Sequence, residues 1–327
     1  MRGRAKRIME REIGVNTWVW VSPLTTDRLG GFAGRARDFG FDLLELPVEA
    51  PGDWDPPTAA EVVAEFGLGA RIVGAMGSGR DLIDPRFRPD TQDYLRHCVE
   101  VAVHVGSPTV AGPFTAATGR VWRMDAGERT AVVRTLREAL RPVAAFAAER
   151  GVTIAVEPLN RYETSIINTV EQGLDALDPL LGEGVGLVLD TYHLNIEERS
   201  PAAAIRTAGE HCRVVQVCGS DRGPVGGDHT DWKAIFDALD DIGYRGPLTV
   251  ESFTGDNDTI AVTASIWRPL AESQDALARS SAEFLTALQR ARAGADHDDH
   301  VPGHDNSSSH DNPAGHDHSA ETAEEQP

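Results

Sequence analysis

At the centre of the sequence lies Val185-Gly-Leu-Val-Leu-Asp-Thr-Tyr-His-Leu-Asn-Ile-Glu-Glu198, an apolar run that ends at Asp190 and is followed by polar residues. A continuous apolar run is what a strand buried on both faces requires. A burst of polar residues directly after it is typical of a functional loop at the C-terminal edge of a parallel sheet. We therefore predict a buried strand over 185–190, followed by a loop that carries His193.

The rest of the chain repeats this pattern of a strand followed by a helix. Apolar, strand-like runs cover 12–20, 41–47, 69–76, 107–113, 151–160, 185–190, 213–219 and 246–253. Amphipathic, helix-like runs cover 28–39, 56–66, 89–105, 125–150, 169–181, 199–210, 231–242 and 274–292. Eight units of each kind predict an α/β fold, a single-domain (β/α)8 TIM barrel. The alternative is an open doubly wound sheet, and no G-x-G-x-x-G follows the first strand to support it.

Three segments are expected along the chain: a basic N-terminal extension over 1–11, a catalytic barrel domain over 12–292, and a disordered tail over 293–327. The tail has nine acidic residues, six histidines and no Lys or Arg. Such a composition buries too little apolar surface to offset chain entropy. Two interpretations of its histidines stay open, a metal-scavenging tail and a merely solvated one.

Charge and composition exclude several partners. The formal net charge is −20, and about −11 without the tail, whereas binding a phosphate backbone needs a cationic surface. We therefore expect no nucleic-acid partner. No apolar run reaches the ~18 residues of a membrane span, and the basic start has no apolar segment of a secretory signal behind it. Three cysteines without a C-x-x-C motif suggest free thiols. A cytoplasmic protein is expected.

Oxygen-bearing side chains stand at the predicted ends of four consecutive strands: Glu157, Asp190, Gln216 and Glu251. Their separations of 33, 26 and 35 residues each match one strand-plus-helix unit. Active sites of such barrels lie at the C-terminal ends of the strands. Three carboxylates there would repel one another unless a cation neutralised them, and oxygen ligands suit Mn²⁺ or Mg²⁺ better than Zn²⁺. The alternative is that each acid is a helix cap or a surface ion pair.

Four further polar residues lie near these strand ends: Glu163, His193, Arg222 and Glu45. By spacing alone, each is as compatible with a structural hydrogen bond as with a substrate contact.

Several motifs resemble those of the ketose 3-epimerases, the D-tagatose, D-allulose (psicose) and L-ribulose 3-epimerases of the xylose isomerase-like barrel superfamily. They are Val156-Glu-Pro-Leu-Asn-Arg-Tyr-Glu-Thr164, Leu189-Asp-Thr-Tyr-His-Leu-Asn-Ile-Glu-Glu198, Ser220-Asp-Arg-Gly223, Thr249-Val-Glu-Ser-Phe253, Gly14-Val-Asn-Thr-Trp-Val-Trp20 and Ile266-Trp-Arg-Pro-Leu270. The similarity extends over residues 12 to 290.

The resemblance implies an isomerase of carbohydrate metabolism that inverts C3 of a free ketose through a metal-stabilised enediolate. Glu157 and Glu251 would be both metal ligands and the acid/base pair, and Asp190 a third ligand. Contacts to the substrate would come from Glu163, His193 and Arg222. The cofactor would be a divalent metal, Mn²⁺ before Mg²⁺ or Co²⁺, and the assembly a homodimer or homotetramer.

One position departs from the family pattern, in which the fourth ligand is usually histidine, because the matching residue here is Gln216. Hydroxypyruvate isomerases are similar to this chain in having Gln there. The alternatives that remain are an aldose–ketose or hydroxypyruvate-type isomerase, or a metal-assisted lyase or dehydratase of an oxidised sugar. An abasic-site endonuclease would need a basic groove, and a non-catalytic metal-binding protein would depend on its tail. The loop Gly77-Ser-Gly-Arg80 is a weak candidate for binding phosphate, which favours a non-phosphorylated sugar.

Overall fold

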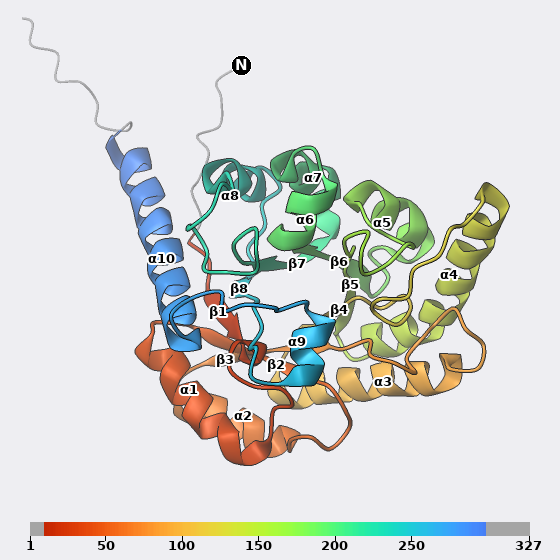
Figure 1. The fold of residues 1–327 in the computed structure, drawn as a ribbon, viewed down its shortest axis with the longest axis horizontal. Coiled ribbons are helices and arrows are strands. Elements are labelled where there is room, and N and C mark those ends of the chain that lie inside the picture. The colour runs from red at the N-terminus through yellow and green to blue at the C-terminus, as the bar shows by residue number, and fades with distance from the viewer. Residues whose placement is uncertain (1–9, 299–327) are drawn as a thin grey trace, which may run out of the picture.

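The computed structural model describes residues 10–298, and within them eight parallel strands close into a barrel with helices around it (Figure 1). Neighbouring strands pair in chain order, and β8 pairs with β1 to close the ring. The strands are β1 (Ile13–Asn16), β2 (Leu43–Val48), β3 (Gly69–Gly74), β4 (Thr109–Gly112), β5 (Thr153–Val156), β6 (Val185–Asp190), β7 (Cys212–Val217) and β8 (Leu248–Val250). The predicted TIM barrel is confirmed.

The helices of the described residues mostly follow the predicted segments. They are α1 (Leu29–Asp38), α2 (Pro56–Glu65), α3 (Arg88–Val105), α4 (Ala126–Ala148), α5 (Val170–Leu177), α6 (Thr191–Glu197), α7 (Pro201–Ala208), α8 (Trp232–Asp241), α9 (Asp258–Thr263) and α10 (Gln274–Asp298). The loop predicted after Asp190 is wrong, because this segment forms α6. The Asp190 side chain accepts a hydrogen bond from the main-chain N–H of Tyr192 and so caps the new helix directly at the strand end.

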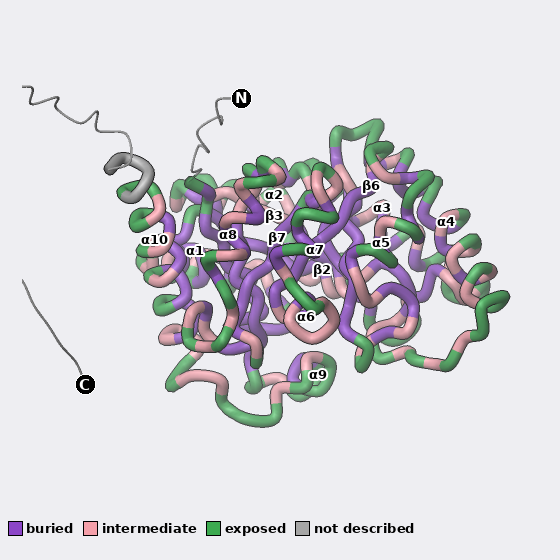
Figure 2. Tube along the Cα trace, turned by 90° about the horizontal axis from the view of Figure 1, so that it is seen from above, coloured by how far each residue is buried: buried purple, intermediate pink, exposed green. Residues whose placement is uncertain are grey.

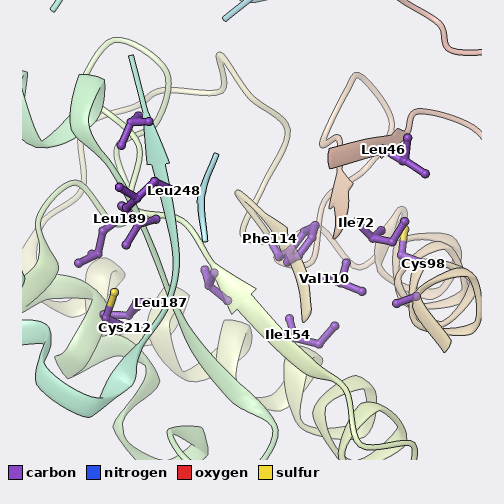
Figure 3. Close-up of a cluster of buried hydrophobic side chains, with 14 of the residues drawn as sticks. Leu46, Ile72, Cys98, Val110, Phe114, Ile154, Leu187, Leu189, Cys212 and Leu248 are labelled. Atoms are coloured by element: carbon purple, nitrogen blue, oxygen red, sulfur yellow. The ribbon is translucent and has the colours of Figure 1, made fainter. Parts of the chain in front are cut away.

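Side chains along each strand alternate between the helix layer and the barrel interior. Leu187 and Leu189 belong to the large apolar cluster shared with the helices, part of which is shown in Figure 3. Val188 belongs to a second cluster, which gathers one residue from each of five neighbouring strands inside the barrel: Val73, Ala111, Ala155, Val188 and Val214. In Figure 2 the barrel strands are coloured mostly as buried, whereas the surrounding helices carry many exposed residues.

The same alternation decides where the polar strand ends point. Asp190 lies two residues after Val188, and Gln216 two residues after Val214, so both continue the inward-facing rows. The strand register also pairs Asp190 with Gln216. The barrel therefore directs these side chains to one place at its C-terminal mouth.

The last helix runs further than its sequence predicts. α10 continues to Asp298, six residues past the predicted end at Arg292 and across the expected start of the tail at 293. The predicted tail beyond residue 298, with five of its six histidines, and residues 1–9 of the predicted N-terminal extension lie outside the described residues. None of the helices between residues 10 and 298 combines the length and apolar character needed to cross a membrane.

Candidate active site

Four buried oxygen-bearing side chains meet at the C-terminal mouth of the barrel. Glu157 follows β5, Asp190 ends β6, Gln216 lies in β7 and Glu251 follows β8, and each is 6% exposed or less. Their main chains are held by the barrel itself: the N–H of Glu157 donates to Gly112, and the N–H of Glu251 donates to the carbonyl of Val217. The structure thus brings together the four residues that were singled out as metal ligands.

Arg222 lies between two of these carboxylates. Its Nη1 donates to Asp190 Oδ2 and, over 3.0 Å, to Glu251 Oε2. The guanidinium lies over the Tyr192 ring, 4.2 Å from its centroid. Arg222 has a φ of 67°, a left-handed conformation that is uncommon outside glycine, and its carbonyl accepts a hydrogen bond from Ser252 Oγ. This turn is what brings a residue from the loop after β7 into the mouth.

His193, on α6, faces the site as a neutral ring with a donor beside each of its nitrogens. The main-chain N–H of Asn160 donates to its Nδ1 over 3.0 Å, and Arg222 Nη2 lies 3.1 Å from its Nε2. Burial and the adjacent Arg222 lower the pKa of His193 to about 3, so the ring is uncharged at neutral pH. Its Nε2 lies 3.4 Å from Glu157 Oε1.

Glu163 completes the polar wall on the β5 side. Its carboxylate accepts a hydrogen bond of 2.7 Å from Asn160 Nδ2, and burial raises its pKa. Asn160 therefore contacts both Glu163 and His193, a role that its sequence position does not reveal. The only sequence signal for it is its place inside the conspicuous motif 156–164.

The electrostatics of the mouth favour a cation. Burial raises the pKa of Glu157 well above its ordinary value, and the nearby Glu251 and Asp190 raise it further. Burial also raises the pKa of Glu251, although Arg222 opposes the shift. Removing carboxylates from water while they repel one another is costly unless positive charge is added.

Two oxygen atoms in the mouth lack a hydrogen-bond partner among the described residues, Glu157 Oε1 and Gln216 Oε1. Both are buried, and a buried acceptor without a partner is unfavourable. Glu157, Asp190 and His193 also each offer a potential ligand atom within 4.8 Å of the others. A divalent metal could thus be held here. Because Asn160 and Arg222 already occupy the two ring nitrogens of His193, carboxylate and amide oxygens are the better ligands, and such a set suits Mn²⁺ or Mg²⁺.

Glu45, which lies in β2, is hydrogen-bonded to the cluster of oxygen-bearing side chains at the mouth. Its Oε2 accepts hydrogen bonds of 2.9 Å from Asn16 Nδ2 and from Gln216 Nε2. Gln216 Nε2 also donates to Glu251 Oε1 over 2.9 Å. The sequence indicated that Glu45 ends a strand, but its contact with Gln216, 171 residues away, follows only from closure of the barrel.

A pocket of about 200 Å³ opens beside these residues. Its walls include Glu157, Glu163, His193, Arg222 and Glu251, together with apolar residues such as Trp18, Phe253 and, next to or within α9, Ile260 and Ala264. The contribution of α9 is not foreseen from the sequence. A pocket that is polar at one end and apolar elsewhere suits a small polyhydroxylated molecule.

Arg80, from the loop considered for phosphate binding, also lines this pocket. Its Nη1 donates to the Ala75 carbonyl over 2.6 Å and its Nη2 to the Glu49 carbonyl. The guanidinium stacks on Tyr94, 3.5 Å from the ring centroid. Arg80 is thus engaged in holding the loops of the pocket together.

Comparisons with known proteins agree with this geometry. A family model described as the xylose isomerase-like TIM barrel matches residues 33–288. The L-ribulose 3-epimerase of Mesorhizobium japonicum is 33% identical over 289 residues, which span 87% of this chain and 96% of that protein.

Solved structures show the same relationship. An L-ribulose 3-epimerase structure superposes with a TM-score of 0.82 at 30% identity, covering 90% of this chain and 99% of the other. A D-allulose 3-epimerase from Methylomonas sp. in complex with D-allulose superposes with a TM-score of 0.77 at 29% identity, covering 87% and 99% of the two chains.

Proposed function

The chain belongs to the ketose 3-epimerase family of xylose isomerase-like TIM barrels, and on this premise we propose that it inverts C3 of a free ketose with a divalent metal. Membership makes it an isomerase of the epimerase type. The observation that carries the proposal is the meeting of Glu157, Asp190, Gln216 and Glu251 at the barrel mouth, where two buried oxygen atoms have no hydrogen-bond partner within residues 10–298.

These four residues would hold the metal, with Mn²⁺ preferred over Mg²⁺ or Co²⁺. The ion, when bound, would polarise the oxygen atoms at C2 and C3 of the sugar and thereby acidify the C3–H. Three carboxylates and one neutral amide oxygen give the hard, oxygen-rich set that such ions prefer.

Glu157 and Glu251 would exchange the proton. One carboxylate takes the proton as the C3–H bond breaks, and the other, as a carboxylic acid, delivers a proton to the opposite face as a new C3–H bond forms. The two residues come from β5 and β8, which are not neighbours in the barrel, so they can reach the sugar from different sides.

The remaining polar groups would orient the sugar. His193 and Arg222 would contact substrate oxygens near C1–C3, and Glu163 can accept a hydrogen bond from a hydroxyl group. The engagement of Arg80 supports a sugar without a phosphate group. The three cysteines are buried free thiols, which supports the reducing environment of the cytoplasm. We retain a homodimer or homotetramer as part of the proposal.

Incubation of the Mn²⁺-loaded protein with free ketoses in D₂O tests this function. D-Allulose and L-ribulose are the first choices, because the similar proteins are named for them. We expect deuterium at C3 and formation of the C3 epimer. Deuterium at C1 would instead indicate an aldose–ketose isomerase, and the absence of exchange at C3 for every ketose would contradict the proposal.

A further inference from the structure

Gln216 departs from the histidine usual in this family, and its amide is held in one orientation by a chain of hydrogen bonds. The chain begins at the main-chain N–H of Trp18, which can only donate, and which binds Asn16 Oδ1 over 2.9 Å. The other end of the Asn16 amide, Nδ2, must then be the group that faces Glu45. Glu45 is therefore an acceptor with a fixed position.

The next link fixes Gln216 itself. Its Nε2 lies 2.9 Å from Glu45 Oε2 and 2.9 Å from Glu251 Oε1, so both N–H bonds are used. Turning the amide over would place Oε1 against two carboxylate oxygens and lose both hydrogen bonds. The side chains of Glu45 and Gln216 are both buried, at 1% and 0% exposed, so bulk water does not compete for these groups.

The consequence appears at the other end of the amide. Gln216 Oε1 is buried and has no hydrogen-bond partner among the described residues. The nitrogen of the same amide is bonded to Glu251, so this oxygen lies close to the predicted metal ligands. We propose that Glu45 is a positioning residue that, together with Asn16, orients the Gln216 amide so that its oxygen is presented to the metal. This inference rests on the proposed metal-dependent function. It adds a residue that touches neither the metal nor the sugar.

The same arrangement explains how a glutamine can replace a histidine here. An amide has two chemically different ends that rotate freely about one bond, so it binds a metal well only when one end is fixed. Groups that orient a metal ligand from behind usually change metal affinity 10- to 100-fold when removed. Glu45 has the position and the hydrogen bonds for this role.

Direct metal binding by the metal-stripped full-length protein, measured by calorimetry with Mn²⁺ at pH 8, tests the inference without depending on turnover. Glu45→Met, which keeps the volume but removes the acceptor, should weaken Mn²⁺ binding 10- to 100-fold. Glu45→Gln keeps an acceptor oxygen and should lose less than tenfold. Asp42→Asn is the control for a carboxylate-to-amide change, because Asp42 precedes β2 at the opposite end of the barrel and accepts a hydrogen bond from the Ile13 N–H rather than from Gln216, and its Mn²⁺ affinity should equal that of the wild type.

A double-mutant cycle then separates positioning from general damage to the site. In the Gln216→Leu background the ligand oxygen is absent, so adding Glu45→Met or Glu45→Gln should change Mn²⁺ affinity by less than twofold. If Glu45→Met does not fold, the Glu45→Gln cycle still decides, because a loss that persists in the Gln216→Leu background would overturn the inference. Wild-type affinity in Glu45→Met would overturn it as well. A wild-type protein that binds no Mn²⁺ would instead refute the proposed metal dependence.

Discussion

Two clusters of charged residues in this barrel, one partly buried and one buried, differ in the balance of their charges. Between α8 and α10, Arg11 and Arg292 face Asp237 and Asp240, with N–O distances of 2.6 to 2.8 Å. At the barrel mouth, Arg222 contacts Asp190 and Glu251. Three more glutamates lie near this group: Glu157, Glu163 and Glu45.

The pKa values reflect this difference. Hydrogen bonds from Lys233 and Arg292 lower the pKa of Asp237 to about 2, so the folded protein stabilises its negatively charged form. Burial raises the pKa of Glu45 to about 7 and those of Glu157 and Glu251 well above their ordinary values. A structural network supplies its own counter-charges, whereas a ligand site keeps unbalanced charge for a molecule or ion that binds.

The largest effect is expected when the acid/base pair of the mouth is changed. Glu157→Gln or Glu251→Gln should lower kcat about 1,000-fold, because the amide can neither accept nor deliver the C3 proton. The metal-free Glu157→Gln variant should be at least as stable as the wild type, since it loses a buried group with a raised pKa. Deuterium exchange at C3 and urea unfolding measure the two quantities. Near wild-type turnover in either variant would show that the residue is not part of the pair.

The balanced cluster should respond in the opposite way. Asp240, whose side chain is 1% exposed, accepts hydrogen bonds from both Arg11 and Arg292. Asp240→Asn should lower the free energy of unfolding by about 3 kcal/mol, because the buried guanidinium of Arg11 and the partly buried guanidinium of Arg292 lose a negative partner. The kcat per folded molecule should stay at the wild-type value. A loss of turnover without a loss of stability would reverse the distinction between the two clusters.

The two clusters should also respond to pH with opposite sign. In the metal-free protein, Glu45 binds a proton up to pH 7, whereas the unfolded chain releases it near 4.5. The folded state thus holds more protons between these values, and this contribution to the free energy of unfolding is lost as the pH rises through 7. The loss is up to about 3 kcal/mol. Asp237 has a lowered pKa, so its contribution is instead lost as the pH falls toward 2.

The Glu45→Gln variant lacks the pH-dependent contribution of Glu45 to the free energy of unfolding. The stability of the wild type relative to this variant should fall between pH 4.5 and pH 8 in urea unfolding with EDTA present. A relative stability that stays level or rises over this range would mean that Glu45 is ionised in the folded protein throughout. Saturating Mn²⁺ should reduce the effect, since a bound cation favours the charged carboxylates.

The balanced cluster could not be foreseen from the sequence, whereas most of the mouth could. The four residues Glu157, Asp190, Gln216 and Glu251 were predictable because strand ends recur at intervals of one strand-plus-helix unit, and parallel strands gather these ends at one edge. The polar residues after Asp190 carry the right chemistry, but their helix was missed because its N-cap is itself the last residue of the strand. Short segments of this kind give little periodicity.

Contacts that depend on closure of the barrel or on an unusual backbone carry no local signal. The bond between Glu45 and Gln216 joins β2 to β7, and it exists because the ring closes around the interior. The place of Arg222 depends on one left-handed residue that is not glycine, which sequence patterns do not mark. Helix α9, with its six residues, is held by the walls of the pocket rather than by its own propensity.

The smallest expected effect concerns which divalent metal ion the mouth prefers. Gln216→His replaces the neutral oxygen with an imidazole nitrogen, which Zn²⁺ and Co²⁺ favour relative to Mn²⁺. We expect the affinity ratio of Co²⁺ to Mn²⁺ to rise about tenfold, equal to about 1.4 kcal/mol. Competition between the two ions for the metal-stripped variant and wild type measures this ratio. Because Asp240→Asn leaves the mouth intact, it serves as the control and should keep the wild-type ratio. An unchanged ratio in Gln216→His would mean that residue 216 lies outside the coordination sphere, and that the three carboxylates alone select the ion.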